Sequence, residues 1–319
     1  MELSSIHHLK IQPSWIIVLS ILGVYSIFKF FIALLKCFYN TFLRPSKNLK
    51  SYGSWALITG STDGIGKAFA FELGKKGLNL ILVGRNSNKL QTVSIEIHTL
   101  SPSIHIKIIV LDFAKDLSNG ILAIEEMVQE IDVGVLVNNV GVTYPKAAYF
   151  HEVHEEVLLN LLKVNVEGTT KVTRAVIGEM LKRKRGAIVN IGSGASIVVP
   201  SHPLYAIYAA TKAYIDQLSR CMYVEYKACG IDVQCQVPLY VATNMASKVA
   251  SIKRTSMFVP SPDAYAKAAI RCIGYGPRCT PYWAHSFQWF LASLLPENLL
   301  DAWRLSIGIQ RMELEFQGE

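Results

Sequence analysis

The chain has 319 residues, of which 51% are hydrophobic and only 18% are charged. This composition excludes an intrinsically disordered chain, and the length suits one large domain or two small ones. The formal net charge is +8. Basic residues do not alternate with aromatic ones as they do in nucleic-acid-binding modules, so no nucleic-acid partner is expected. The six cysteines form no CxxC pair, which argues against a disulfide framework and against a metal site.

The first element is an apolar run from Trp15 to Leu35 whose only charge is Lys29. About 20 apolar residues span the hydrocarbon core of a bilayer as one helix, so we expect a transmembrane anchor at about 15–35. A cleaved signal peptide fits less well, because the run is long and no small-residue cleavage site follows it. A buried helix of a soluble protein is the other alternative. Most of the flanking basic residues follow the run, and the positive-inside rule then places the rest of the chain in the cytosol.

From Trp55 onward, short apolar runs alternate with longer stretches of helical pattern. This alternation predicts an α/β fold with a doubly wound parallel sheet of the Rossmann type. The expected strands lie at residues 55–59, 79–84, 105–112, 133–139, 187–193 and 232–238. After Thr243 the alternation is lost. We therefore expect an anchor with a basic linker at 1–50, a Rossmann-like domain at 51–250, and a helical C-terminal appendage at 251–319.

The first expected strand runs into the sequence TGSTDGIG, Thr59 to Gly66, which opens a helix. Glycines at such a turn allow a tight bend and a close backbone approach to a pyrophosphate, and the helix N-terminus presents free N–H groups to it. The strand–turn–helix context favours this interpretation over a plain structural turn. The residues expected to bind a dinucleotide here are Gly60, Ser61, Thr62, Asp63, Gly64, Ile65 and Gly66.

The end of the second expected strand indicates which dinucleotide is bound. A carboxylate at this place usually meets a free ribose 2′-hydroxyl, but here Gly84 is followed by Arg85. A guanidinium suits a 2′-phosphate, so NADP(H) is preferred over NAD(H). An ordinary solvated arginine is the alternative. Further cofactor contacts are expected near the carboxyl ends of the next strands, at Asp112, Asn139 and Gly141.

The motifs TGxxxGIG, NNxG and YxxxK, in this order, resemble those of the short-chain dehydrogenase/reductase superfamily over about residues 53–245. Longer segments, such as VNVEGTTKVT and VQCQVPLYVAT, are similar to the very-long-chain 3-oxoacyl-CoA reductases of plants, close relatives of steroid 17β-dehydrogenases. The resemblance implies a catalytic tetrad of Asn165, Ser193, Tyr208 and Lys212. In the family, the asparagine holds a water that relays protons through the lysine. The resemblance also implies that Pro238 and Thr243 flank the nicotinamide, although a leucine stands where a glycine often follows the proline.

Elementary chemistry supports the roles of Tyr208 and Lys212. A tyrosine hydroxyl titrates at about 10, and a neighbouring ammonium lowers that pKa so that the tyrosine can donate a proton. On a helix, the two residues lie on one face, roughly 6 Å apart along its axis. Ser193 would hold a substrate carbonyl, with Ser196 as the alternative serine. Tyr205, at the expected start of the helix, would contact the substrate.

The resemblance implies NADPH-dependent reduction of a long-chain or very-long-chain 3-oxoacyl-CoA to a 3-hydroxyacyl-CoA, in the endoplasmic reticulum membrane with the catalytic domain facing the cytosol. The implied partners are the lipid bilayer and the other elongation enzymes, namely the condensing enzyme, the dehydratase and the enoyl reductase. A steroid dehydrogenase and a non-catalytic elongase scaffold stay as alternatives. A homodimer through the long helices around 155–184 and 205–229 stays open.

The C-terminal region contains an apolar and aromatic run from His285 to Leu295. Pro296 follows, and the run is too short to span a bilayer as a helix. It would cover a long acyl chain, enter the membrane interface, or form a plain core helix.

Overall fold

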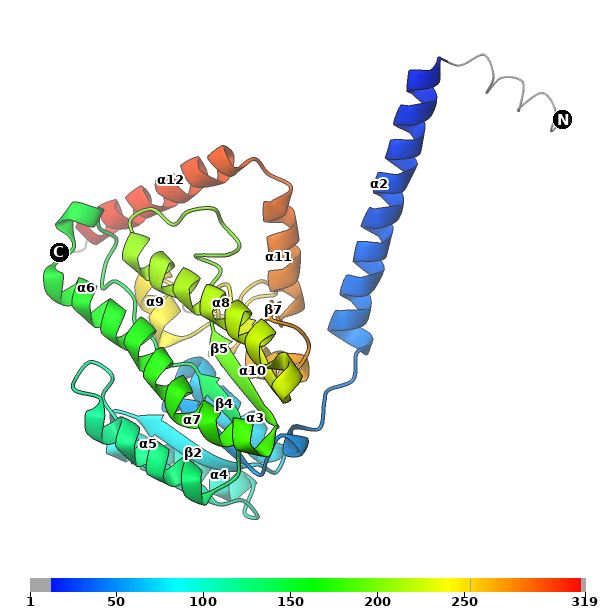
Figure 1. Cartoon of the computed structure of the whole chain (residues 1–319). Helices are drawn as coiled ribbons and strands as arrows, with labels where there is room; N and C mark the ends of the chain where they lie inside the picture. Colours follow the sequence, from blue (N-terminus) through cyan, green and yellow to red (C-terminus); the bar gives the residue numbers. More distant parts are fainter. Residues whose placement is uncertain (1–12, 253, 317–319) are drawn as a thin grey trace. The chain divides into compact units, whose positions relative to one another are not determined.

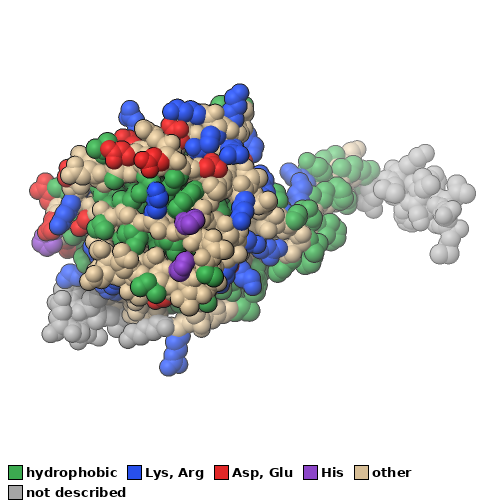
Figure 2. Space-filling view, turned by 90° about the horizontal axis from the view of Figure 1, so that it is seen from below, with side chains coloured by type: hydrophobic (Ala, Val, Ile, Leu, Met, Phe, Trp, Pro, Cys, Tyr) green, Lys and Arg blue, Asp and Glu red, His purple; other side chains and the backbone are tan. Residues whose placement is uncertain are grey.

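A computed structural model of the protein describes residues 13–252 and 254–316, which fall into two units. The N-terminal unit ends at Pro45 and contains helix α2, Ser14–Phe38, followed by a π-helical turn, Tyr39–Leu43. Apolar side chains cover the surface of α2 (Figure 2). Among the described residues, one helical segment, Ser14–Ile32, is long and apolar enough to cross a membrane, by length and composition. This segment coincides with the expected anchor.

The second unit, Ser46–Glu319, is built around one sheet. Within the described residues, seven parallel strands form it in the order β3-β2-β1-β4-β5-β6-β7. The strands are β1 Trp55–Thr59, β2 Asn79–Gly84, β3 Ile106–Val110, β4 Val133–Asn138, β5 Gly186–Ile191, β6 Ile231–Gln236 and β7 Arg278–Cys279. Strand order reverses between β1 and β4, which is where doubly wound sheets bind ligands. The predicted Rossmann-like fold is confirmed.

Helices cover both faces of this sheet (Figure 1). Successive residues of β1 point to opposite cores, because side chains alternate along a strand. Ala56 and Ile58 pack with one set of helices and Leu57 with the other. The first set is α3 Gly64–Lys75, α4 Ser87–Leu100 and α10 Pro262–Cys272, and the second is α5 Ser118–Glu130, α7 Thr169–Arg183 and α8 Ala206–Tyr226. Burying each such leucine or isoleucine contributes about 1.5–3 kcal/mol, which explains the continuous apolar runs of the strands.

The remaining helices lie beyond the carboxyl ends of the strands (Figure 1). They are α6 Glu155–Leu161, which continues through the π-helical turn Leu162–Gly168 into α7, together with α9 Asn244–Ala250, α11 Trp283–Ser293 and α12 Glu297–Phe316. The C-terminal region is helical, as expected, but it also takes part in the sheet domain. Helix α10 packs beside α3, and β7 pairs with β6. A strand of two residues is too short to leave a periodic pattern in the sequence.

Candidate active site

A cavity of about 980 Å³ lies at the carboxyl ends of the strands. One end is formed by the turn after β1 and by the ends of β2, β3 and β4; it is called the cofactor end because the residues predicted to bind a dinucleotide lie there. The other is formed by α9, α11, α12 and the loop before α8, and it is called the substrate end because Tyr205, predicted to contact the substrate, lies there. The predicted site residues that line the cavity are Gly60, Thr62, Asp63, Gly64, Ile65, Arg85, Asp112, Asn139, Gly141, Ser193, Tyr205, Tyr208, Lys212, Pro238 and Thr243. Ser61, Gly66 and Asn165 lie behind this wall.

The turn after β1 owes its shape to glycine. Gly60 and Gly64 have φ values of 66° and 54°, in the left-handed region that side chains disfavour. A Cβ atom on Gly66 would lie only 2.3 Å from the carbonyl oxygen of Gly60, so α3 packs directly onto the turn. The carboxylate of Asp63 caps α3 by accepting the N–H of Gly64 at 2.7 Å, and the Ser61 hydroxyl bonds to strand β2. This cradle fits a pyrophosphate.

Asn139 fastens the glycine turn to strand β4. Its Nδ2 donates to the carbonyl oxygens of Thr59 and Gly60, at 3.0 and 3.2 Å. The preceding Asn138 is buried and donates to Thr173 and Asn190 instead. Of the two neighbouring asparagines, Asn139 therefore supports the cofactor end.

The end of β2 supplies an exposed cation to the cavity. Arg85 follows the buried Gly84, and both line the wall. Within the described residues, Arg85 makes no ion pair. The nearby carboxylate of Asp112 accepts the N–H of Ala114 at 3.1 Å and so shapes its own loop. A guanidinium without a protein counter-ion fits a phosphate at this end of the cavity.

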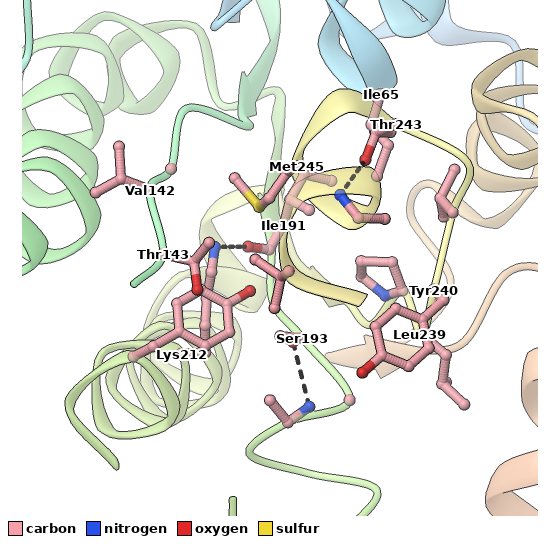
Figure 3. Close-up of a pocket in the computed structure, with 18 of the residues that line it drawn as sticks. Ile65, Val142, Thr143, Ile191, Ser193, Lys212, Leu239, Tyr240, Thr243 and Met245 are labelled. Carbon is pink, nitrogen blue, oxygen red and sulfur yellow. Dashed lines mark hydrogen bonds between the residues drawn. The ribbon is translucent and has the colours of Figure 1, made fainter. Parts of the chain in front are cut away.

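Tyr208 and Lys212 project from α8 toward the end of β5, where Ser193 follows the strand; Figure 3 labels Lys212 and Ser193. Tyr208 and Ser193 both line the cavity. Burial raises the pKa of Tyr208 above its usual range, and the nearby Ser193 side chain opposes that rise. Lys212 donates from Nζ to the carbonyl oxygen of Ile191 at 2.9 Å, and burial lowers its pKa to about 8. Burial is the largest cause of both shifts.

The two candidate serines occupy different places. Ser193 lines the cavity, and its Oγ accepts the N–H of Ala195 at 3.2 Å. The Ser196 hydroxyl donates to the carbonyl oxygen of Ser193 at 3.2 Å and is not part of the wall. The geometry therefore favours Ser193 as the serine that meets a substrate.

Asn165 lies in the π-helical turn Leu162–Gly168. Its Oδ1 accepts the N–H of Val142 at 2.8 Å, and its Nδ2 donates to the carbonyl oxygen of Val142 and to a threonine hydroxyl of α8, at 2.9 and 3.0 Å. A Cβ atom on Gly141 would lie 3.3 Å from Asn165 Oδ1 and 3.4 Å from Lys212 Nζ. Turns of this kind re-aim a side chain and are frequent at functional sites. Asn165 thus holds the loop after β4 against α8, beside Lys212.

The loop after β6 is held by a helix from the C-terminal region. His285 of α11 is fully buried; its Nδ1 accepts the N–H of Leu239 at 3.4 Å, and its Nε2 lies 3.1 Å from the carbonyl oxygen of Tyr240. Burial lowers the pKa of His285 to about 4, so the ring is neutral at pH 7 and can accept at one nitrogen and donate at the other. Thr243 then caps α9 by accepting the N–H of Ala246 at 3.2 Å (Figure 3).

Most of the substrate end was not predicted residue by residue. Tyr205 is 1% exposed and packs against the rings of Tyr144 and His202, with centroids 5.4 and 5.2 Å apart. Helices α11 and α12 and the turn between them add an apolar rim, whose residues are 45–54% exposed: Leu291, Leu295, Leu299 and Trp303. The apolar, aromatic run in this part of the sequence was the available signal. Helix α12 also contributes Arg304 to the wall, and this residue was not predicted from the sequence.

Comparisons with known proteins agree with this geometry. Residues 54–253 match the family model described as short chain dehydrogenase. The chain is 61% identical over 284 residues to a very-long-chain 3-oxoacyl-CoA reductase-like protein of Arabidopsis thaliana, covering 89% of this chain and 90% of that protein. It is 43% identical over 251 residues to the human inactive hydroxysteroid dehydrogenase-like protein 1, covering 79% and 75%.

A solved short-chain dehydrogenase from Sphingobium yanoikuyae in complex with NADPH aligns with a TM-score of 0.60 at 28% identity, over 68% of this chain and 83% of that one. The fold and the site thus define a dinucleotide-binding oxidoreductase as the class of protein. The chain belongs to the short-chain dehydrogenase/reductase family, which uses a nicotinamide cofactor.

Proposed function

We propose that the protein is an NADPH-dependent reductase of long-chain or very-long-chain 3-oxoacyl-CoA, acting in fatty-acid elongation. The observation that carries the proposal is that Tyr208, Ser193 and Lys212 line the same cavity as the glycine turn and an apolar wall. The polar groups suit a carbonyl, and the wall suits a long acyl chain. The name of the Arabidopsis relative supports the 3-oxoacyl-CoA as substrate.

The residues present fit NADPH. The glycine turn would hold the pyrophosphate and Arg85 the 2′-phosphate, with Asp112, Asn139 and Gly141 along the crevice, and Pro238 and Thr243 beside the nicotinamide. When bound, NADPH supplies the hydride. The related dehydrogenase solved with NADPH supports this choice of cofactor.

The chain's own residues would handle the carbonyl oxygen and its proton. Ser193 would hold the C3 oxygen by a hydrogen bond, and Tyr208 would donate its hydroxyl proton to that oxygen. The raised pKa keeps Tyr208 protonated at neutral pH, so the proton that the step requires is present. Lys212 would add its positive charge and hold the ribose, and Asn165 would support a water that returns a proton through Lys212.

We further propose that α2 anchors the protein in the endoplasmic reticulum membrane with the second unit in the cytosol. Its length and apolar surface suit a span, and elongation would bring the condensing enzyme, the dehydratase and the enoyl reductase as partners. Protease treatment of sealed microsomes should digest the second unit from the outside. A catalytic unit protected until detergent is added would reverse the proposed orientation.

Two alternatives follow from the name of the human relative. A steroid dehydrogenase would use the same polar groups on a different ketone. A non-catalytic scaffold would keep the fold without turnover. The joint presence of Tyr208, Ser193 and Lys212 at the cavity favours an enzyme over the scaffold.

The test is NADPH oxidation by the purified full chain in detergent, with a long-chain 3-oxoacyl-CoA and an oxo-steroid competing. We expect the acyl-CoA to be reduced and Tyr208→Phe to lower the rate roughly 10²- to 10⁴-fold, with an unchanged circular dichroism spectrum. Preferential reduction of the steroid would establish the first alternative. NADPH binding without turnover of either substrate would establish the second.

A further inference from the structure

Helix α12, at the upper left in Figure 1, brings the guanidinium group of Arg304 to the substrate end of the cavity, and Arg311 of the same helix contacts Tyr240 of the cavity wall. Arg304 is 8% exposed and lines the cavity, and its Nη2 lies 2.7 Å from Nδ1 of His202. Arg311 donates from Nη2 to the hydroxyl oxygen of Tyr240 at 2.9 Å. Among the described residues, neither arginine has a carboxylate within 4.0 Å.

Neither of the two residues that these arginines contact is a carboxylate. Burial and the two neighbouring cations lower the pKa of His202 to about 3, so its ring is neutral at pH 7, and Tyr240 offers a hydroxyl. Asp301, one turn before Arg304 on α12, bonds to Ser201 instead. Within the described residues, the charge of Arg304 therefore lies at the cavity and that of Arg311 beside Tyr240 of its wall, with no carboxylate within 4.0 Å of either.

Arg304 also has hydrogen-bonding capacity that the protein leaves unused. Its Nε is buried and has no hydrogen-bond partner in the described structure. A buried cation without a counter-ion, and a buried donor without an acceptor, both cost free energy. Nε and Nη2 of one guanidinium form the fork that suits two oxygens of a carboxylate or phosphate. The site is therefore built for an anion that arrives with a ligand.

The cofactor does not supply this anion. Its phosphates fit the glycine turn and Arg85, at the opposite end of the same cavity. An acyl chain supplies none either, because it is apolar and suits the rim of Leu291, Leu295 and Leu299. In a 3-oxoacyl-CoA, the negative charges are on the phosphates of the CoA portion.

We propose that Arg304, with Arg311 beside it, binds a phosphate of the CoA portion of the substrate and thereby selects CoA thioesters over uncharged ketones. This inference rests on the proposed function, whose substrate it specifies further. Arg304 is the direct ligand. Arg311 adds positive charge and fixes the hydroxyl of Tyr240, which shares the wall.

The test compares two thioesters with the same saturated acyl chain, hexadecanoyl-CoA and hexadecanoyl-N-acetylcysteamine, which lacks phosphates. Their binding to the full chain in detergent is measured by calorimetry with saturating NADPH, so that the cofactor site is filled. We expect Arg304→Gln to weaken binding of the CoA thioester roughly tenfold to a hundredfold, and binding of the other thioester about twofold at most. Arg220→Gln, on an exposed arginine of α8 outside the cavity, is the matched control and should change neither.

If Arg304→Gln weakened the binding of both thioesters equally, or did not weaken the binding of the CoA thioester, the inference would be overturned. A measurement that needs no folded variant accompanies it: added salt should weaken binding of the CoA thioester to the unaltered chain and spare the other. Salt-insensitive binding of the CoA thioester would also overturn it. Reduction of 3-oxoacyl-CoA without dependence on Arg304 would sink this inference alone. Arg304-dependent binding without reduction would sink the proposed function alone.

Discussion

The two ends of the cavity differ in whether backbone or side chains form their walls. The cofactor end is shaped by backbone: the glycine turn, the start of α3 and the carboxyl ends of neighbouring strands. The substrate end is shaped by side chains from α9, α11, α12 and the loop before α8, which are far apart along the chain. Backbone shape demands particular residues at fixed spacing, whereas an apolar wall demands only volume. The two ends should therefore respond differently to small changes.

The largest difference should come from adding one methyl group at the cofactor end. In Gly66→Ala, the new Cβ would meet the carbonyl oxygen of Gly60 at 2.3 Å, and overpacking against backbone must open the turn. We expect NADPH to bind roughly tenfold to a hundredfold more weakly, with the affinity for hexadecanoyl-CoA little changed, both measured by calorimetry. Gly178→Ala is the matched control, since its Cβ would have nothing within 4 Å. Equal NADPH affinity in the two variants would refute the proposal that the glycine turn binds NADPH.

A charge reversal tests the selectivity of the same end. Arg85→Asp places a carboxylate where the 2′-phosphate of NADPH is proposed to lie, and it offers an acceptor to a ribose hydroxyl. The ratio of kcat/KM for NADPH to that for NADH should fall roughly tenfold or more. Arg85→Gln should give a smaller shift in the same direction. An unchanged ratio in both variants would remove Arg85 from the cofactor site.

The pH profile tests the catalytic groups between the two ends. Lys212 loses its charge as pH rises through about 8, while Tyr208 stays protonated because its pKa is raised. We expect kcat/KM to fall above pH 8, by roughly tenfold per unit if the ammonium is essential. An activity that stays level to pH 10 would contradict a role for that charge.

The pH dependence of protein stability shows whether the fall of kcat/KM above pH 8 comes from unfolding. The pKa of Lys212 in the folded protein lies below its ordinary value of 10.5, so the unfolded chain binds more protons between about pH 8 and 10.5. The contribution of Lys212 to the free energy of unfolding therefore rises with pH across that window. In thermal denaturation, the midpoint temperatures of wild type and Lys212→Met should converge as pH rises from 8 to 10.

The smallest effect is expected at the substrate end. Tyr205→Phe keeps the ring that packs against Tyr144 and His202 and removes only the hydroxyl. We expect KM for the 3-oxoacyl-CoA to change by about two- to fivefold, with kcat and the affinity for NADPH nearly constant, in steady-state kinetics. A loss of kcat comparable to that of Tyr208→Phe would show that the two tyrosines had been assigned the wrong way round.

The cofactor end could be predicted from the sequence more completely than the substrate end. The strands from Trp55 to Gln236 were predicted with small differences at their ends, because parallel strands buried on both faces are apolar throughout. The glycine turn was legible because its backbone admits few residues. Ser193 needed the structure to separate it from Ser196, since both follow β5 and only packing distinguishes them. Arg304 left no motif, because a helix brings it to the cavity from more than 90 residues beyond Tyr208.

The hydrogen bonds of His285 have a consequence for engineering by recombination. The histidine belongs to a helix of the substrate end, yet it holds the backbone of Leu239 and Tyr240, next to Pro238 in the proposed nicotinamide site. A chimera that imports α11 from a relative to change substrate range would also import a new support for this loop. The crossover point therefore belongs before β6 rather than after it, so that the loop and the helix that holds it are inherited together.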